Sequence, residues 1–492
     1  MALVYKFIQQ FYSNIDYYIP DRYNEGYGVS TQGVDYASET GVGLIIVLDC
    51  GIKAVDEIAY AKEKGIDFII CDHHVPDEVL PPAVAILNAK REDNTYPYEH
   101  LSGCGVGFKF MQAFAISNGI EFHHLIPLLD LVAVSIASDI VPLVDENRIL
   151  AHYGLLRLNA SPSKGLLSII KICGLDRHNI TIDDIVFKIG PRINAAGRMR
   201  MDENDENAAP SGGYAAVNLL IEGNESLAEE FGSVIDGFNQ DRKCIDRSVT
   251  QEAHDFIEAH AELKAAKSTV IYNPRWMKGI VGIVASRLIE TYYRPTVVLT
   301  MSNGFVTGSA RSVPGFDLYQ AIESCSDLLE NFGGHMYAAG LTMRPERVEE
   351  FTRRFNAYVE ENIDPITLQP QVEIDSELFF SNITPAFRRD LNRFQPFGPG
   401  NPAPVFVTRG VVSHGETKLV GADCEHLRMD LMQRQKPNTT IQTIAFQQPT
   451  HYEWIRAGHP IDVCYQIVEN HYRGSVSVQL RIKDIKPLRS KQ

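Results

Sequence analysis

The chain has 492 residues, too many for one hydrophobic core, and this length predicts roughly three or four domains. Hydrophobic residues make up 45% of the chain and no apolar run approaches the ~20 residues of a membrane-spanning helix, which excludes a membrane protein. The 46 Lys and Arg residues against 62 Asp and Glu residues give a net charge of −16, which disfavours binding of nucleic acid by the surface as a whole. A local basic groove can still lie on an acidic protein.

The eight cysteines are scattered and include no Cys-x-x-Cys pair. This distribution argues against a zinc ribbon or a disulfide framework and is typical of a reducing cytoplasm. The first segment, MALVYKFIQQFYS, lacks the basic head and cleavage site of a signal peptide. Its apolar residues have helical spacing, so we expect a core helix that starts at residue 1.

The first ~150 residues alternate strand-like runs with helical ones. The runs that we predict as strands are DYYIP (16–20), LIIVLD (44–49), FIICD (68–72) and VAILN (84–88). AVDEIAYAKEK (54–64) has a helical pattern. This order predicts a parallel sheet with right-handed crossovers, and ligands of such sheets bind at the carboxyl ends of the strands.

A long helix is predicted from Glu225 to about His260, where apolar residues recur at helical spacing without a proline. A second α/β region follows, in which 317–332 reads as a helix, and short alternating runs after Pro365 predict a small β-barrel of the OB type. The fold class is therefore α/β, with a parallel-sheet domain and a smaller α/β domain joined by a long helix, plus a C-terminal β-barrel. The predicted divisions are 1–150, 151–224 (a helical and loop extension), 225–260 (the helix), 261–362 and 370–492.

The stretch FIICDHHVPDE carries the strongest candidate site, because Asp72, His73 and His74 follow a strand. Asp49 ends the preceding strand 23 residues earlier, about one βαβ unit, so both carboxylates should lie at the same edge of the sheet. Carboxylate and imidazole together suit Mg²⁺ or Mn²⁺. In the alternative interpretation, one histidine lies on the surface or caps a turn, and Asp72 only ends a strand.

Another carboxylate, Asp139, ends a very apolar helix, where burying it without a partner would be costly. Asp130 lies nine positions earlier, which puts it on the opposite face of a continuous helix. Only one of the two can point at the site. We assign Asp139 to it and expect Asp130 to be a structural residue.

Three glycine-containing segments have the character of anion-binding sites. They are GPRINAAGRM with Arg192, Asn194 and Arg198, TGSARS with Ser309 and Arg311, and GGHMYAAG with Gly333, Gly334 and His335. Glycine lets backbone amides approach a phosphate and arginine binds it with two donors, although such a segment on its own more often just turns the chain. Together with a metal-type cluster they predict a phosphorylated substrate.

With these residues assembled, the sequence resembles the DHH phosphoesterase superfamily and, within it, the RecJ-type single-strand-specific 5′-to-3′ DNA exonucleases. The stretches that carry the resemblance are YIPDRYNEGYG, VLDCG, CDHH, SGCGVGFK, SIASDIVPL, GPRINAAGRM, NPRWMKGIVGIVASRL, GSARS, GGHMYAAG and PFGPGNPAPVF. The resemblance implies a DHH domain, a connecting helix, a DHHA1 domain and an OB-like domain that grips single-stranded DNA.

The resemblance also implies roles for the candidate residues. Asp49, His73 and Asp139 would bind metal, His74 would lie near the scissile phosphate, and Asp72 would orient the histidines. The 5′-phosphate pocket and the path of the strand would consist of Arg22, Arg192, Asn194, Arg198, Ser309, Arg311, Gly333, Gly334 and His335. Two Mn²⁺ or Mg²⁺ ions would drive hydrolysis to 5′-mononucleotides in DNA repair and recombination. The setting implied is the bacterial cytoplasm, with a monomer that works beside a RecQ-type helicase and a single-strand-binding protein.

One departure from the family pattern concerns the N-terminus. Family members carry an Asp-x-Asp-x-Asp-Gly motif at the end of a first strand; this chain lacks it, and MALVYKFIQQFYS resembles the helix that follows it. We therefore expect a truncated chain with impaired nuclease activity. The alternatives are a catalytically inactive DHH-family scaffold that binds single-stranded DNA, and a DHH phosphodiesterase of short oligonucleotides. The presence of the metal-type residues speaks against the first alternative, and the β-rich C-terminal region against the second.

Overall fold

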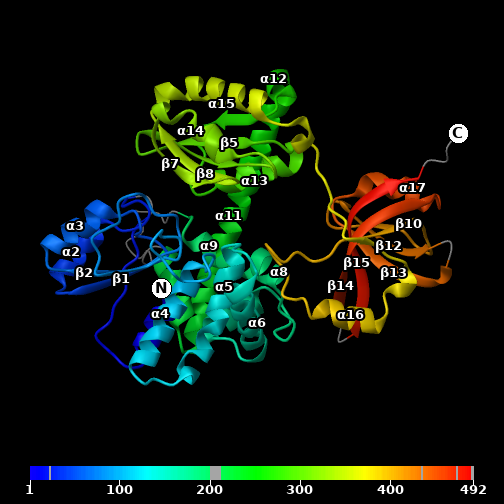
Figure 1. The fold of residues 1–492 in the computed structure, drawn as a ribbon. Coiled ribbons are helices and arrows are strands. Elements are labelled where there is room, and N and C mark those ends of the chain that lie inside the picture. Colours follow the sequence, from blue (N-terminus) through cyan, green and yellow to red (C-terminus); the bar gives the residue numbers. More distant parts are fainter. Residues whose placement is uncertain (22–23, 200–211, 434–435, 473–474, 489–492) are drawn as a thin grey trace. The chain divides into compact units, whose positions relative to one another are not determined.

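The computed structural model describes residues 1–21, 24–199, 212–433, 436–472 and 475–488 (Figure 1). The chain forms two compact units, 1–370 and 371–492. None of the helices in these ranges is long and apolar enough to cross a membrane.

The first unit begins with a three-stranded parallel sheet whose order is β1-β2-β3. Its strands are β1 (Leu44–Leu48), β2 (Asp67–Cys71) and β3 (Ala85–Leu87), and its helices are α2 (Thr31–Glu39) and α3 (Val55–Glu63). The register pairs Leu48 with Cys71 and Cys71 with Leu87. The three strands therefore end level with one another, as their predicted parallel order requires, and the residues that follow them meet at one edge.

The prediction of a strand at 16–20 is wrong, because this segment pairs with no strand among the described residues. The backbone N–H of Ile19 donates instead to the hydroxyl of Tyr214, at 3.2 Å. The hydroxyl of Tyr17 likewise donates to the side chain of Asn218. Side chains of a helix far along the chain thus take the place of a strand partner.

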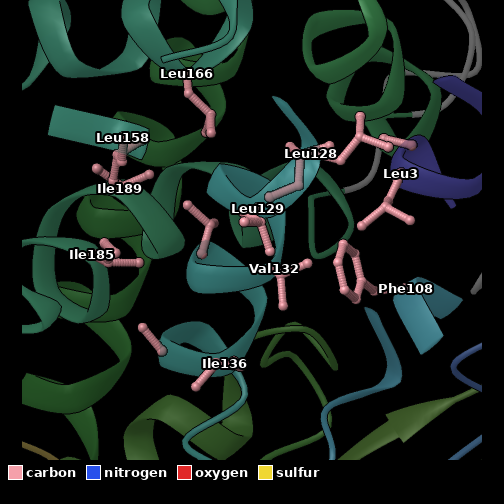
Figure 2. Packing of buried hydrophobic residues seen from close by; sticks show 14 of the residues in the cluster. Leu3, Phe108, Leu128, Leu129, Val132, Ile136, Leu158, Leu166, Ile185 and Ile189 are labelled. Atoms are coloured by element: carbon pink, nitrogen blue, oxygen red, sulfur yellow. The ribbon is translucent and has the colours of Figure 1, made fainter. Parts of the chain in front are cut away.

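A helical layer packs beside this sheet and includes the expected helix at the start of the chain. Its helices are α1 (Ala2–Ile8), α4 (Gly103–Ser117), α5 (Leu129–Ser138), α6 (Asp145–Ala160), α7 (Lys164–Ile172), α8 (Ile182–Asp184), α9 (Gly190–Ala196) and α10 (Gly212–Ile221). A π-helical turn, Ile185–Ile189, joins α8 to α9. In the core, Leu3, Phe108 and Val132 pack together with residues of α6, α7 and the π-helical turn (Figure 2). Helix α5 is buried along nearly its whole length and carries Asp139 directly after its last residue.

The predicted long helix is α11 (Glu225–Ala259), which contacts α7, α9 and α13. It leads into a five-stranded mixed sheet of order β4-β5-β6-β8-β7. Its elements are α12 (Ala261–Ala265), β4 (Thr269–Tyr272), α13 (Val281–Tyr292), β5 (Thr296–Ser302), β6 (Phe305–Arg311), α14 (Leu318–Glu323), β7 (Leu329–His335), β8 (Ala338–Met343) and α15 (Val348–Asn362).

The helix predicted at 317–332 is too long. Helix α14 ends at Glu323, and the residues from Leu329 onward belong to β7. They pair with β8, where Leu329 lies opposite Met343 and Phe332 opposite Leu341. This pairing across a hairpin outweighs the helical spacing of the apolar residues.

The second unit contains the predicted β-barrel. Its elements are β9 (Ser376–Glu377), α16 (Pro385–Asn392), β10 (Phe406–Ser413), β11 (Lys418–Val420), β12 (His426–Gln433), β13 (Lys436–Ala445), α17 (Tyr452–Arg456), β14 (Ile461–Tyr472) and β15 (Ser475–Pro487). Strands β10, β12, β13, β15 and β14 pair in a closed ring, since β10 pairs with both β12 and β14. The ring surrounds the fully buried Tyr465, whose hydroxyl lies 2.8 Å from that of Thr408. Closure of five strands confirms the OB-like barrel.

Helices α5 and α6 pack closely at Gly154, so a larger residue at this position should destabilise the fold. A Cβ at this position would overlap the carbonyl oxygen of Leu129 and lie 2.6 Å from the Cβ of Ala133. We therefore expect Gly154→Ala to lower the free energy of unfolding by about 1–3 kcal/mol. Gly237→Ala is the control: its Cβ would meet nothing within 4 Å, and alanine favours the α11 helix by roughly 0.5–1 kcal/mol. Urea unfolding followed by circular dichroism measures both; equal stabilities of the two variants would contradict the packing argument.

Candidate active site

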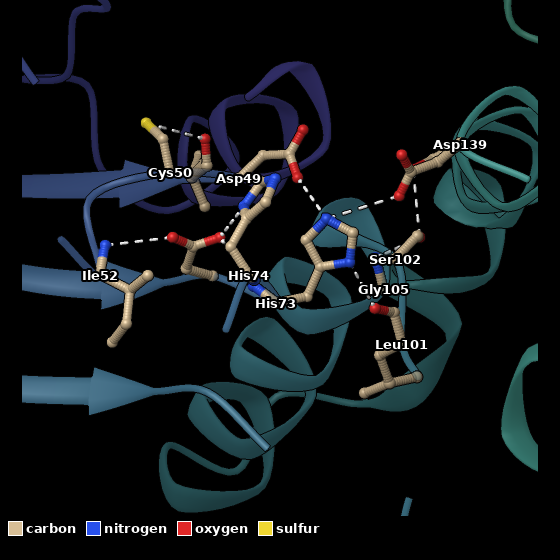
Figure 3. Close-up of polar contacts among 12 residues, drawn as sticks. Asp49, Cys50, Ile52, His73, His74, Leu101, Ser102, Gly105 and Asp139 are labelled. Carbon is tan, nitrogen blue, oxygen red and sulfur yellow. Dashed lines mark hydrogen bonds and ion pairs between the residues drawn. The ribbon is translucent and has the colours of Figure 1, made fainter. Parts of the chain in front are cut away.

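The carboxyl ends of β1 and β2 and the end of α5 bring five polar residues together (Figure 3). We call Asp49, Asp72, His73, His74 and Asp139 the carboxylate–histidine cluster. Oδ1 of Asp49 lies 3.2 Å from Nε2 of His73, and Oδ2 of Asp139 lies 3.5 Å from the same nitrogen. Ligand atoms of Asp49, His73 and His74 all lie within 4.8 Å of one another. These residues, predicted from three separate motifs, therefore form one group that can hold a cation.

Hydrogen bonding orients His73 for metal binding. Its Nδ1 lies 3.0 Å from the carbonyl oxygen of Leu101, which can only accept, so Nδ1 carries a proton and Nε2 faces the two carboxylates. Burial lowers the pKa of His73, but the hydrogen bond to Asp49 and the charges of Asp139 and Asp49 outweigh it and raise the pKa overall. The site therefore favours positive charge between Asp49 and Asp139, and a divalent cation would supply it.

Asp72 is almost completely buried and anchors both histidines. Its Oδ1 accepts hydrogen bonds from Nδ1 of His74 at 2.7 Å and from the backbone N–H groups of His73 and His74 at 2.7 and 3.2 Å. Its Oδ2 accepts from the N–H of Ile52 at 3.1 Å. Burial would raise the pKa of Asp72, but the hydrogen bond and charge of His74 and the backbone donors lower it overall. The ionised carboxylate holds His74 so that Nε2 remains available.

Asp139 lies in the carboxylate–histidine cluster and Asp130 does not, as helical geometry predicts. Burial raises the pKa of Asp139, with the charge of His73 opposing the shift. Asp130 lies elsewhere, fully buried, and accepts hydrogen bonds from the N–H groups of Leu131 and Ser163, each at 2.7 Å. Asp130 is thus a structural residue that joins α5 to the loop before α7.

Asp49 adopts a backbone conformation that few residues other than glycine adopt, with φ of 68°. Its N–H still donates to the carbonyl of Cys71 at 2.9 Å, which continues the pairing of β1 with β2. Gly103, the first residue of α4, lies directly against its side chain, and a Cβ there would be 2.7 Å from the Cβ of Asp49. Gly103 is not among the residues predicted from the sequence, where its only signal is its place in SGCGVGFK.

A cavity of about 480 Å³ lies in the first unit, and most of its lining comes from α13, the residues before it and the five-stranded sheet. We call it the cationic cavity; it is lined by Tyr27, Arg198, Lys278, Gly279, Val281, Gly282, Thr307, Gly308, Ser309, Arg311, Asn331, Gly333, Gly340, Leu341 and Thr342. Nη1 of Arg311 donates to Oγ of Ser309 at 2.8 Å, and burial lowers the pKa of Arg311. The described residues that line the cavity include no Asp or Glu, so the lining favours binding of an anion.

Four of the predicted phosphate-site residues, Arg198, Ser309, Arg311 and Gly333, line this cavity. Lys278 and Tyr27 line it too, although the sequence reasoning did not select them. Lys278 lies in the motif NPRWMKG, where a lysine before a glycine was the available signal.

Arg192 and Asn194 do not line the cavity, because they lie in helix α9, which ends before Gly197 and Arg198. Nε of Arg192 forms an ion pair with Asp236 of α11 at 2.8 Å. A carboxylate of the protein itself therefore neutralises the charge of Arg192. Gly190 serves packing, because a Cβ there would lie 2.6 Å from Oγ of Ser138. Arg22 lies outside the described residues.

Gly334 and His335 end strand β7, next to Gly333 but outside the cavity lining. Nδ1 of His335 accepts the N–H of Tyr337 at 3.3 Å. Burial lowers the pKa of His335, and the positive charges of Arg311 and Lys90 lower it further. The charges of Arg311, in the cavity, and of Lys90, in the loop after β3, therefore both act on His335.

Family models match three segments of the chain. The DHH family N-terminal domain matches residues 1–136, the DHHA1 domain matches 265–361, and the RecJ OB domain matches 374–484. The first covers the parallel sheet, most of α5 and every residue of the carboxylate–histidine cluster except Asp139. The second contains much of the cationic cavity.

Relatives resemble the chain along nearly its whole length. The single-stranded-DNA-specific exonuclease RecJ of Bacillus subtilis is 35% identical over 97% of the chain, which spans 58% of that protein. The protein of the same name from Haemophilus influenzae is 32% identical over 97% of the chain and 83% of its own length. Among solved structures, RecJ in complex with Mn²⁺ from Thermus thermophilus has a TM-score of 0.79 at 25% identity, covering 99% of this chain and 67% of that one. Exonuclease RecJ bound to manganese has a TM-score of 0.59 at 28% identity, covering 74% and 88%.

The contact between Gly103 and Asp49 generates a second prediction. Gly103→Ala should displace the Asp49 carboxylate, because the new Cβ would overlap it. Binding of Mn²⁺ should weaken at least about tenfold, since Asp49 could then no longer coordinate the ion. Gly105→Ala in the same helix is the control, since its Cβ would make only ordinary contacts, the nearest at 3.4 Å. Isothermal titration calorimetry with Mn²⁺ distinguishes them; unchanged affinity in Gly103→Ala would show that Asp49 does not need this position.

Proposed function

The chain belongs to the RecJ family of single-stranded-DNA-specific exonucleases, and we propose that it removes mononucleotides from the 5′ end of single-stranded DNA. The observation that carries the proposal is the presence, in one compact unit, of a metal-type cluster and a cationic cavity. The first can activate water at a phosphodiester, and the second can hold a terminal phosphate.

The donor set of the cluster fits a hard or borderline divalent cation. Asp49 and Asp139 offer carboxylate oxygens and His73 offers Nε2, a combination that suits Mn²⁺ or Mg²⁺. Among the described residues, one group of His, Cys, Asp and Glu side chains has ligand atoms close enough to share a metal ion, and it consists of Asp49, His73 and His74. When bound, the ion would lower the pKa of water and stabilise charge on the phosphoryl group. We propose that the working metal is Mn²⁺ or Mg²⁺, because the donor set suits both, and we use Mn²⁺ in the experiments because two similar RecJ structures hold manganese.

The protein's own groups would position the substrate. His74, whose side chain is 47% exposed, is held through Nδ1 by Asp72 and presents Nε2 to a phosphate oxygen or to the leaving group. Arg311 and Ser309 would bind the 5′-terminal phosphate from the cavity wall, with Arg198 as a further donor. Holding the terminal phosphate while the next bond meets the cluster would make the enzyme release one nucleotide at a time.

The closed barrel of the second unit supports a single-stranded substrate, since OB-folds bind single strands through stacking and backbone contacts. A need for single strands would explain work beside a RecQ-type helicase and a single-strand-binding protein. These partners, the monomeric state and the cytoplasmic location stay predictions.

The experiment compares substrates with the purified chain and Mn²⁺. Because the sequence contains no Asp-x-Asp-x-Asp-Gly motif, we expect slow release of mononucleotides from a 5′-phosphorylated single-stranded oligonucleotide, and no product from a blunt duplex or a metal-chelated reaction. Tight binding of the strand without release would favour the inactive scaffold. Faster cleavage of a dinucleotide than of a long strand would favour a phosphodiesterase of short oligonucleotides.

The cationic cavity generates a third prediction. Arg311→Gln should reduce the preference for a 5′-phosphorylated over a 5′-hydroxyl strand by roughly 10- to 100-fold. This factor corresponds to the loss of one or two charge-assisted hydrogen bonds to the terminal phosphate. Arg344→Gln is the matched control, because Arg344 is exposed and pairs with Glu330 away from the cavity lining. Ratios of kcat/KM for the two strands provide the readout, and an unaltered ratio in Arg311→Gln would place the terminal phosphate elsewhere.

A further inference from the structure

The loop after β3 reaches the same sheet edge as the carboxylate–histidine cluster. Because β3 lies next to β2 and runs parallel to it, the residues after Leu87 lie beside those after Cys71. The buried Asn88 joins the two loops: its Nδ2 donates to the carbonyl oxygen of His74 at 2.8 Å. Its Oδ1 accepts the backbone N–H of Lys90, also at 2.8 Å. The position of Lys90 is therefore tied to that of His74.

The ammonium group of Lys90 lies among charged groups without pairing closely with any. The side chain is half-buried, and within the described residues its Nζ takes part in no hydrogen bond or ion pair. Burial lowers the pKa of Lys90, while the charges of Asp139, Asp72 and Glu99 oppose the shift. A partly desolvated cation without a close partner is unfavourable, which a bound anion would relieve.

The charge of Lys90 acts on the carboxylate–histidine cluster and on a residue beside the cationic cavity. It acts on His73 and Asp139 in the carboxylate–histidine cluster. It also acts on His335, the residue that is influenced by Arg311 of the cationic cavity. A DNA backbone that runs from the cavity to the cluster would thus come within reach of this ammonium group.

We propose that Lys90 binds a non-bridging oxygen of the scissile phosphate and stabilises the charge that develops on it. The inference rests on the proposed exonuclease function and adds a residue to it. A compact ammonium on a flexible stem suits this task, since it can follow the phosphate as its geometry changes. The competing role, in which Lys90 only offsets repulsion among the acidic side chains, makes different predictions for DNA and for metal.

The test uses the full chain and the variants Lys90→Ala, Lys90→Arg and Lys62→Ala. Lys62 is an exposed lysine of α3 and controls for the loss of one positive charge. With 5′-phosphorylated single-stranded DNA and Mn²⁺, we expect Lys90→Ala to lower kcat about 100-fold, comparable to loss of one transition-state donor. Lys90→Arg should recover most of this loss, and Lys62→Ala should match the unmodified chain.

Binding measurements separate the two roles of Lys90. In EDTA, the slope of log affinity for the strand against log salt should fall by about 0.7 in Lys90→Ala, the effect of one lost phosphate contact. Affinity for Mn²⁺ should stay equal or become tighter, because a positive charge has left the cation's surroundings. Weaker binding of Mn²⁺ with an unchanged salt slope would overturn the proposal, as would kinetics equal to those of Lys62→Ala. Absence of nucleotide release by the unmodified chain would refute the exonuclease function itself, and the salt slope would still decide whether Lys90 contacts phosphate.

Discussion

The buried carboxylate of Asp72 is the interaction on which the arrangement at the sheet edge depends. It accepts hydrogen bonds from the two residues after it, from the His74 ring and from Ile52 of the neighbouring loop. Each hydrogen bond to a charged group contributes roughly 1.5–3 kcal/mol, which offsets the cost of removing the carboxylate from water. Because these donors come from the loops after β1 and β2, one ionised group sets the positions of both loops.

Close packing at glycines brings the other parts of the site to this edge. Gly103 lets the start of α4 lie against Asp49, and Gly190 lets α9 approach Ser138, the neighbour of Asp139. In helix α13, beside the second sheet, a Cβ at Gly282 would lie 3.0 Å from Oγ of Ser309 and 3.2 Å from Nη2 of Arg311. At each of these glycines a Cβ would crowd a polar side chain. They let the helices come close enough for the polar groups to meet.

Charge is distributed locally in a way that the net charge conceals. The chain carries −16 overall, yet the lining of the cationic cavity contains Arg198, Lys278 and Arg311 and no acidic residue. The carboxylate–histidine cluster has the opposite character and attracts cations. The net charge therefore does not by itself exclude the proposed DNA substrate, because salt screens the charges that lie far from a bound strand.

The sequence by itself determined which residues form the cluster. Parallel strands of similar length end at one edge, so Asp49 and the segment from Asp72 to His74 had to meet, and helical periodicity separated Asp139 from Asp130. The barrel was equally predictable, because alternation along a strand is a local property. The tertiary structure alone decided that residues 16–20 form no strand, that Arg192 pairs with Asp236, and that Gly103 supports Asp49. The reason is physical: a partner hundreds of residues away, or the space left beside a Cα atom, leaves no periodic trace in the sequence around the residue it affects.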